Sequence, residues 1–402
     1  MKGNVFNTKL KEIMIHSKSY TDKANAIIAQ ELGSNLSVFG HRVTVISIST
    51  NVSESISTDK IRSNLNFIQL PHYTDDLSLS GFIKRGFLLT KIYKNFKPDF
   101  IVSLDPILPE TFLPLLIGYA RRIPTLVYFT DNWGIDPDRG RKLIEQIIEE
   151  FLIVCSLKLG SAHIYSSELV KNRLKKYSKK QGEIIPQGFN YDEFSDIKSP
   201  QVDKIKREKP GIREQNKIIL TSFDFREIET YIKLAKSFEL NNYKFTLHVI
   251  NDTSNLSSLR EVDYLLRKGY LIISNRLERD RYIRAVLESD VLWISGPDSF
   301  WDRARFPTRL PEYMASGNPI VSSIRGTTES FLSQNGYAAI ANFAFPNHDV
   351  SSLLESFNFM TSSDFLVAES TKKAKNYAYK NLKWVKIAAN LNDILDLIDS
   401  KE

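Results

Sequence analysis

FPTRLPEYMASGNPIV, residues 306–321, carries the clearest local pattern in the chain. A helix that begins near Thr308 leaves free N–H groups and the positive end of its dipole at one edge, an arrangement that suits a diphosphate. Pro307 is tolerated there because the N–H that it lacks is not needed. Gly317 is expected to end the helix before a buried strand over 319–323. The alternative is an ordinary capped helix with a surface arginine and glutamate.

Short β-rich runs alternate with longer helical patterns on the N-terminal side of this stretch, which is typical of helices packed on parallel sheets. The chain should therefore form two doubly wound α/β domains that face one another, with a ligand cleft at the carboxyl ends of their strands. A helix over 22–39 should close at Gly40, a suitable left-handed C-cap. The predicted strands cover residues 12–16, 42–48, 66–70, 99–104, 125–130, 162–166, 183–186, 217–222, 244–250, 270–274, 291–295 and 319–323.

The length of 402 residues favours two domains over one oversized core, since a domain averages roughly 150 residues. We expect a first domain over 1–190, a second over 191–378 and a terminal amphipathic helix over 379–402 that returns toward the first domain. Residues 194–215 are polar and charged without clear periodicity, so they are interpreted as the connection and a frayed entry to the second domain.

Composition places the chain among globular proteins, with a 42% hydrophobic fraction and a formal charge of +7. Cys155 is the only cysteine, the first twenty residues hold no uninterrupted apolar run, and no stretch reaches the ~18 apolar residues of a membrane span. These observations predict a cytoplasmic protein with no spanning segment.

The positive charge belongs to the first half of the chain. Residues 1–190 hold 25 Lys and Arg against 18 Asp and Glu, whereas 191–402 hold 29 of each. This asymmetry suggests an anionic partner such as a membrane surface, or else an unspecific positive surface. Residues 82–97 mix apolar and basic side chains. A core-facing helix is the favoured interpretation there, and peripheral contact with an anionic membrane stays open. No nucleic-acid-binding module is recognised, so no nucleic acid is expected.

No metal site is predicted. The six histidines are scattered without ligand spacing, and one cysteine cannot build a zinc site. Asp136-Pro137-Asp138 spells D-x-D, but a proline-anchored turn is the preferred interpretation. Neither a Walker A loop nor a G-x-G-x-x-G fingerprint occurs. We therefore expect neither a bound metal nor a resident cofactor.

Four segments, in this order, resemble the GT-B glycosyltransferases, particularly the large retaining group related to glycosyltransferase family 4. The third is the most specific, because it is similar to the family's P-K-L-E-Y-M-A-x-G-K-P-V-V donor-site helix. The segments are FGHRVTV at 39–45, IIPQGFN at 184–190 followed by Phe194, the stretch 306–321, and the tail 377–398 with Trp384 before an apolar stripe.

The resemblance implies two facing Rossmann-like domains, with the terminal helix packing back across the cleft. The first domain would bind the acceptor and the second a nucleotide-sugar, which is a co-substrate of the transfer of a sugar to a hydroxyl group. Arg226 and Arg309 would neutralise the departing diphosphate, and Glu312 would accept hydrogen bonds from the ribose hydroxyls. Thr308 and Gly188 complete the expected donor contacts.

The chain departs from the family pattern at three places. Ala304 stands where relatives often carry the first of two glutamates, and Glu227 stands where they often carry a lysine beside Arg226. The loop 17–22 lacks the paired glycines of many relatives, so Lys18 or the loop's N–H groups would have to substitute. Whether the anomeric configuration is retained or inverted is therefore open. A sugar-nucleotide epimerase and a non-catalytic GT-B scaffold remain alternatives.

Two carboxylates follow strands of the first domain and should face the cleft. Asp131 comes after the strand at 125–130 and Asp105 after the strand at 99–104. Either could take or position the proton of an attacking hydroxyl, and Asp131 is preferred because relatives often have His or Asp at its position. Either could instead cap a helix.

Overall fold

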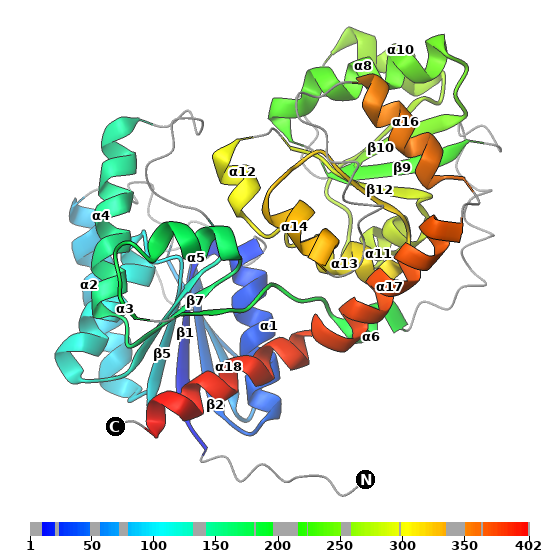
Figure 1. Cartoon of the computed structure of the whole chain (residues 1–402). Helices are drawn as coiled ribbons and strands as arrows, with labels where there is room; N and C mark the ends of the chain where they lie inside the picture. The colour runs from blue at the N-terminus through cyan, green and yellow to red at the C-terminus, as the bar shows by residue number, and fades with distance from the viewer. Residues whose placement is uncertain are drawn as a thin grey trace, which may run out of the picture. The chain divides into compact units, whose positions relative to one another are not determined.

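The computed structural model describes residues 10–20, 24–48, 57–71, 79–131, 142–180, 182–195, 216–222, 224–250, 259–296, 299–334, 350–362 and 365–400. The chain divides into two compact units, each described here by itself (Figure 1). The first unit contains residues 1–187, 304–306 and 384–402, and the second contains 188–303 and 307–383. The expected connection over 196–215 lies outside the described residues. No helix in the described part of the chain combines the length and hydropathy that a membrane span requires.

The first unit is built on an eight-stranded sheet with the order β3-β4-β2-β1-β5-β6-β7-β8. Its strands are parallel except for the edge pair β3 and β4. The strands are β1 (Glu12–Tyr20), β2 (Arg42–Ile48), β3 (Ser57–Arg62), β4 (Leu65–Leu70), β5 (Phe100–Leu104), β6 (Thr125–Phe129), β7 (Ala162–Tyr165) and β8 (Gly182–Ile184). The helices are α1 (Ala24–Val38), α2 (Leu79–Asn95), α3 (Pro109–Arg121), α4 (Leu143–Leu159), α5 (Glu168–Leu174) and α18 (Trp384–Asp399).

The seven strands predicted for this half are all present, and β3 is an addition that the sequence did not indicate. Its residues STDKIR are polar except for Ile61 and pair only with β4, which is typical of an edge strand. The predicted left-handed C-cap after α1 is confirmed, because Gly40 has φ +94°. α1 itself begins at Ala24 rather than Asp22, and residues 21–23 lie outside the description.

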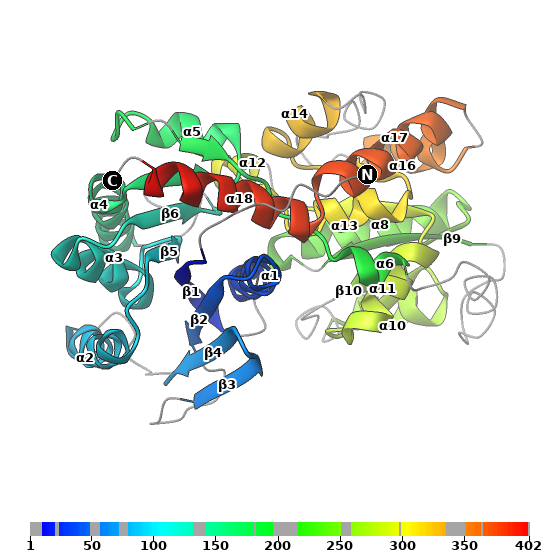
Figure 2. The same cartoon turned by 90° about the horizontal axis from the view of Figure 1, so that it is seen from below.

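Alternate side chains of the sheet feed two apolar layers. Ile13 and Ile15 point to a cluster completed by α1 and α18, while Met14 points to a cluster with α2 and α3. Figure 2 shows the strands between α1 on one side and α2 and α3 on the other. α4 and α5 extend the second layer over β6 and β7. The first unit is thus doubly wound, as the sequence predicted.

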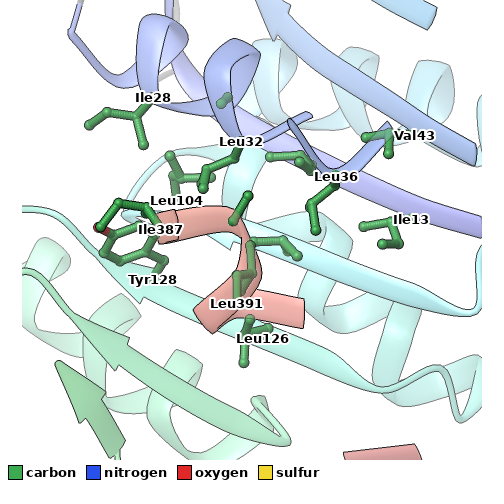
Figure 3. Close-up of a cluster of buried hydrophobic side chains, with 14 of the residues drawn as sticks. Ile13, Ile28, Leu32, Leu36, Val43, Leu104, Leu126, Tyr128, Ile387 and Leu391 are labelled. Carbon is green, nitrogen blue, oxygen red and sulfur yellow. The ribbon is translucent and has the colours of Figure 1, made fainter. Parts of the chain in front are cut away.

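The C-terminal helix α18 is an integral part of the first unit's core. Ile387 and Leu391 are buried beside Leu32 of α1 and Leu126 and Tyr128 of β6 (Figure 3). Polar contacts fix the same helix. The Nε2 of His41 lies 2.8 Å from the Oδ1 of Asn392, and the Lys11 ammonium pairs with Asp396. Residues as far apart in the sequence as Ile13 and Leu395 therefore share one apolar layer.

The second unit is built on a five-stranded parallel sheet with the order β11-β10-β9-β12-β13. The strands are β9 (Lys217–Ser222), β10 (Phe245–Ile250), β11 (Leu271–Ser274), β12 (Val291–Ile294) and β13 (Ile320–Ser322). The helices are α6 (Tyr191–Ser195), η3 (Phe225–Glu227), α8 (Ile228–Leu240), α10 (Arg260–Arg267), α11 (Arg279–Glu288), α12 (Phe300–Ala304), α13 (Leu310–Ser316), α14 (Thr327–Gln334), α16 (Val350–Met360) and α17 (Phe365–Asn381). In Figure 1, α8, α10 and α16 cover one face of this sheet, and α11, α13 and α17 cover the other.

Both sheets contain the strand order 3-2-1-4-5 of doubly wound nucleotide-binding folds. In the second unit the order reverses between β9 and β12, so the connections that follow these two strands run to opposite sides. Ligands of such folds bind outside the carboxyl ends of the strands at this reversal. The groups that follow β9 and β12 are therefore the first place to look for a site.

Leu391→Ala tests the contribution of α18. The side chain is 1% exposed, so its removal leaves a cavity and should lower the free energy of unfolding of the first unit by about 2–4 kcal/mol. Leu397→Ala on the same helix is the control, because that side chain is 56% exposed. Urea titration of both variants measures the difference. Equal destabilisation of the two variants would show that α18 does not belong to the core.

Candidate nucleotide-sugar site

A hydrogen-bond network joins the carboxyl ends of β9 and β12. The Oγ of Ser295 lies 2.7 Å from the Oγ1 of Thr221, 3.1 Å from the Oη of Tyr231 and 3.2 Å from the carbonyl oxygen of Ser222. Tyr231 also donates to that carbonyl and accepts from the N–H of Asp224 at 3.0 Å. Burial raises the pKa of Tyr231, so the phenol stays protonated and can donate. The loop after β9 is therefore held firmly beside β12.

Arg226 lies in this loop, clamped between two carboxylates. Its Nε and Nη2 donate to Asp224 at 3.0 and 2.7 Å, and its Nη1 and Nη2 donate to Asp302 at 2.9 and 3.2 Å. Burial by itself would lower the pKa of Arg226, but the hydrogen bonds and charges of Asp224 and Asp302 raise it. The guanidinium charge, expected to face a diphosphate, is thus already balanced by two anions.

Asp302 is completely buried and is also held by Ser299, the residue before α12. The Oγ of Ser299 donates to its carboxylate at 2.5 Å, and its N–H donates back to Ser299 at 3.1 Å. Glu227, at the position where a lysine was sought, is buried as well. Arg226, Asp224 and Asp302 therefore form one ion-pair network, which sequence reasoning did not anticipate because Asp302 is 76 residues from Arg226.

Arg309 is the cation that remains open at the strand reversal. Its Nη2 donates to the carbonyl oxygen of Ser295 at 3.2 Å, which fixes the guanidinium at the carboxyl end of β12. Its buried Nε has no hydrogen-bond partner within the described part of the chain, and no carboxylate there forms an ion pair with it. A buried N–H without a partner is unfavourable, so this group is suited to an anionic ligand.

The predicted helix start requires a correction. α13 begins at Leu310, and Thr308 lies exposed in the preceding turn. The N–H of Leu310 donates a hydrogen bond to the carbonyl oxygen of Pro307 at 3.0 Å, so it is not available to a ligand. The proline in the first turn of the helix is Pro311, not Pro307. α13 has only seven residues, the N–H of Leu310 is already bonded and Pro311 has no N–H. The start of this helix is therefore a weaker anion-binding group than the sequence predicted. Gly317 ends it with φ +79°, as predicted.

Glu312 is oriented by two side chains of α11. Its Oε2 accepts from the Oη of Tyr282 at 2.8 Å, and its Oε1 pairs with the Nη2 of Arg279 at 2.6 Å. Arg279 also pairs with Glu193 at 2.5 Å. Burial would lower the pKa of Arg279, but Glu312 and Glu193 raise it. An ionised carboxylate has about four acceptor sites, so Glu312 can still accept hydrogen bonds from a ligand hydroxyl.

Arg279 and Tyr282 were not predicted. The signal that could have found them is the position of α11, which follows β11 and therefore begins at the ligand-binding edge of the sheet. Gly188 is buried where the chain enters the second unit, and the neighbouring Phe189 N–H donates to the carbonyl of Leu382 at 2.9 Å. Among the described contacts, none brings Gly188 to Arg309 or Glu312.

The carboxylate of Asp105 holds two strand ends of the first unit together. Asp105 is completely buried, has φ +44°, and accepts from the N–H of Thr130 at 2.8 Å, the Thr130 hydroxyl and the N–H of Asp131 at 3.4 Å. It does not cap α3, whose N-cap residue is Leu108. Asp131 follows Thr130 just after the end of β6 and is half-buried. Of the two residues, Asp131 is thus partly accessible to solvent, whereas Asp105 is not.

His16 ends the regular part of β1, beside the strand reversal of the first unit. Its Nε2 lies 2.8 Å from the Oη of Tyr93, and the adjacent Glu110 is paired with Arg85 at 2.8 Å, both fully buried. Burial lowers the pKa of His16 to about 3, outweighing a hydrogen bond with the backbone of Glu110 that raises it. The loop predicted over 17–22 is in part a strand, because β1 continues to Tyr20. The side chains at 18–22 lie outside the description, and so does the D-x-D at 136–138.

Ala304 is 1% exposed at the end of α12, where a glutamate would be buried. No group of three or more histidine, cysteine, aspartate or glutamate side chains in the described ranges could hold a metal ion. The alanine at 304 removes a contact to the sugar that the resemblance would imply. The statement on metal ligands holds for the described residues alone.

The whole chain is similar to solved glycosyltransferase structures. A glycosyltransferase from Rickettsia africae ESF-5 has a TM-score of 0.71 at 17% identity, covering 98% of this chain and 100% of that one. WaaG, involved in lipopolysaccharide biosynthesis, has a TM-score of 0.67 at 14% identity, covering 95% and 99%. HepE of Anabaena, in complex with UDP and glucose, has a TM-score of 0.66 at 13% identity, covering 96% and 99%. No family profile and no curated protein sequence matches the chain. The chain has the GT-B fold.

Asp302→Asn tests the clamp on Arg226. The substitution keeps the shape of the side chain but removes the charge, leaving the guanidinium with one carboxylate. We expect the free energy of unfolding of the second unit to fall by about 2 kcal/mol in a urea titration. Asp280→Asn on the exposed side of α11 should change little. A similar small change in both variants would contradict a stabilising role for the clamp.

The buried neutral His16 predicts a loss of stability in acid. Its folded-state pKa is about 3 and its ordinary value 6.5, so the unfolded chain binds the extra proton between these values. The contribution of His16 is complete above pH 6.5 and declines toward pH 3 by up to about 1.4 kcal/mol per pH unit. His16→Gln should flatten the fall in unfolding free energy between pH 6.5 and 4. An unchanged slope would mean that His16 is accessible to protons in the folded state.

Proposed function

We propose that the chain is a glycosyltransferase that moves a sugar from a nucleoside diphosphate-sugar to a hydroxyl acceptor without a metal ion. The observation that carries the proposal is Arg309, an unbalanced cation at the strand reversal of a GT-B second unit. Its neighbour one turn along is Glu312, an oriented carboxylate. The solved structure of Anabaena HepE in complex with UDP and glucose supports a nucleotide donor of this kind.

Each residue has a distinct part in this proposal. Arg309 contacts the diphosphate and stabilises the negative charge that develops as the glycosidic bond breaks. Glu312, held by Arg279 and Tyr282, accepts hydrogen bonds from the ribose hydroxyls. Arg226, bound to Asp224 and Asp302, fixes the loop that borders the diphosphate, and Thr308 lies in the turn beside Arg309.

The proposed transfer needs the acceptor, the donor and one base, and no oxidant or reductant. The acceptor oxygen forms a bond to the anomeric carbon, and the bond from that carbon to the diphosphate oxygen breaks with its electrons on the diphosphate. The acceptor proton passes to a base, for which Asp131 at the end of β6 is the candidate. The acceptor would therefore bind to the first unit.

A peripheral contact of the first unit with an anionic membrane belongs to the same proposal. Within the segment 82–97, α2 buries Arg85, Leu89 and Tyr93, which supports the interpretation as a core-facing helix. Among the side chains of α2 that the structure describes, from residue 83 onward, the exposed large apolar ones are Ile83 and Phe87. A membrane contact therefore needs a larger apolar face than α2 provides.

Thermal unfolding with UDP, GDP, ADP and TDP, with and without EDTA, tests the donor site. One nucleotide should stabilise the wild type, by about 2.7 kcal/mol when present at 100 times its dissociation constant, and EDTA should not matter. Arg309→Gln and Glu312→Ala should each weaken its affinity, by about 1–3 kcal/mol. Arg284→Gln on the exposed side of α11 is the control.

If no nucleotide stabilises the protein, the proposal fails and a non-catalytic scaffold takes its place. If a nucleotide binds, product analysis with a nucleotide-sugar and no acceptor separates the remaining alternative. Conversion of one nucleotide-sugar into another under these conditions would identify an epimerase instead of a transferase.

A further inference from the structure

Arg279 divides its hydrogen bonds unequally between two carboxylates of the second unit. Its Nε and Nη2 both donate to one oxygen of Glu193, at 2.9 and 2.5 Å. Toward Glu312, the described contact is that of Nη2 with Oε1 at 2.6 Å. The Nε–Nη2 edge of a guanidinium can bind a carboxylate through two parallel hydrogen bonds. In this structure that edge is directed to Glu193 and not to Glu312.

Glu312 keeps acceptor sites in this arrangement. An ionised carboxylate has about four of them, two on each oxygen. In the described part of the chain, the Oη of Tyr282 donates to Oε2 at 2.8 Å and Arg279 contacts Oε1. Burial and the charge of Glu312 raise the pKa of Tyr282, so the phenol is protonated and can donate. Each oxygen thus has about one acceptor site left, which matches the two neighbouring hydroxyls of a ribose.

Aromatic packing within the second unit fixes the position of Glu193. This residue belongs to α6, where the next residue, Phe194, is 6% exposed and packs edge-on against Phe189 with 5.7 Å between the ring centroids. Tyr379 of α17 contacts the rings of Phe189 and Tyr191, with centroids 5.5 and 5.4 Å apart. α6 is therefore held against α17, and its carboxylate reaches Arg279 at the start of α11.

We propose that Glu193 is a positioning residue of the donor site and makes the site select ribonucleoside diphosphates over their 2′-deoxy analogues. By engaging the Nε–Nη2 edge of Arg279, it leaves two acceptor sites of Glu312 open for the 2′- and 3′-hydroxyls. A 2′-deoxy nucleotide would cover one of these sites without a donor, which is unfavourable. The inference rests on the proposed function, because it concerns the nucleotide that Glu312 is proposed to bind.

Glu193→Ala changes the number of acceptor sites that remain on Glu312. Without Glu193, the guanidinium of Arg279 is free to bind both oxygens of Glu312 through two parallel hydrogen bonds. Together with the Tyr282 hydroxyl, these bonds leave about one acceptor site. One site is enough for the 3′-hydroxyl of a 2′-deoxy nucleotide but not for both hydroxyls of a ribonucleotide. The variant should therefore lose affinity for the ribonucleotide alone.

Asp192→Ala is the matched control. Asp192 is the exposed residue before Glu193 in α6, and its substitution removes the same charge. A carboxylate repels an anionic nucleotide, so the loss of charge by itself should leave the affinity unchanged or raise it. Weaker binding of the ribonucleotide to Glu193→Ala but not to Asp192→Ala thus has the opposite sign from a general electrostatic effect.

Isothermal titration calorimetry with UDP, GDP and ADP, and with the 2′-deoxy form of each, tests the inference. The selectivity is the Kd of the 2′-deoxy nucleotide divided by the Kd of the ribonucleotide. For the nucleotide that binds, the wild-type selectivity should be about tenfold. Glu193→Ala should weaken binding of the ribonucleotide about fivefold and lower the selectivity to about twofold. Asp192→Ala should keep the wild-type selectivity, and Glu193→Ala should have no further effect in a Glu312→Ala background.

Two results would overturn this inference and leave the proposed function intact. One is a wild type that binds the ribonucleotide and its 2′-deoxy form equally well. The other is an unchanged selectivity in Glu193→Ala, including the case in which both nucleotides bind more weakly, as a purely structural role would produce. Thermal unfolding without nucleotide should be nearly unchanged in this variant, because Arg279 and Glu193 are 44% and 28% exposed. A wild type that binds no nucleotide would instead overturn the proposed function, and this inference with it.

Discussion

Ser295 joins the carboxyl ends of β9 and β12, and the geometry of the candidate donor site depends on this junction. Its hydroxyl lies within hydrogen-bonding distance of Thr221 and Tyr231, and its carbonyl accepts from Arg309. Tyr231 in turn holds the N–H of Asp224, from which the loop with Arg226 begins. The parallel strand order makes the junction possible, because it brings the ends of β9 and β12 together while their connections leave in opposite directions.

Arg226 and Arg309, the two arginines beside the junction, differ in the charges that surround them. Arg226 lies between two carboxylates, so its first effect is to hold the loop after β9 against α12. Arg309 has a backbone carbonyl as its partner, and no carboxylate among the described residues forms an ion pair with it. Without a lysine at 227 and without a glutamate at 304, the proposed stabilisation of a leaving diphosphate depends chiefly on this one guanidinium. From the family resemblance alone, we expected Arg226 and Arg309 to share the stabilisation of the diphosphate.

Much of the fold could be predicted from the sequence because its causes are local. Runs of β-branched residues marked the strands, and Gly40 and Gly317 marked two helix ends that need positive φ. β3 was missed because an edge strand needs no apolar pattern. The partners of Arg226 and Glu312 could not be predicted, since Asp302 and Arg279 come close only after the sheet has formed. The same holds for α4, whose apolar positions repeat like those of any core helix, although its first half buries Gln146 and Glu149 and exposes five large apolar side chains.

The central claim is that a nucleoside diphosphate binds at the strand reversal of the second unit. A crystal structure of the protein with the nucleotide that stabilises it most is the direct test. The account predicts the diphosphate within hydrogen-bonding distance of the Arg309 guanidinium and the ribose hydroxyls on the carboxylate of Glu312, with Arg226 still bound to Asp302. A nucleotide bound elsewhere, with Arg309 and Glu312 out of contact, would contradict the account.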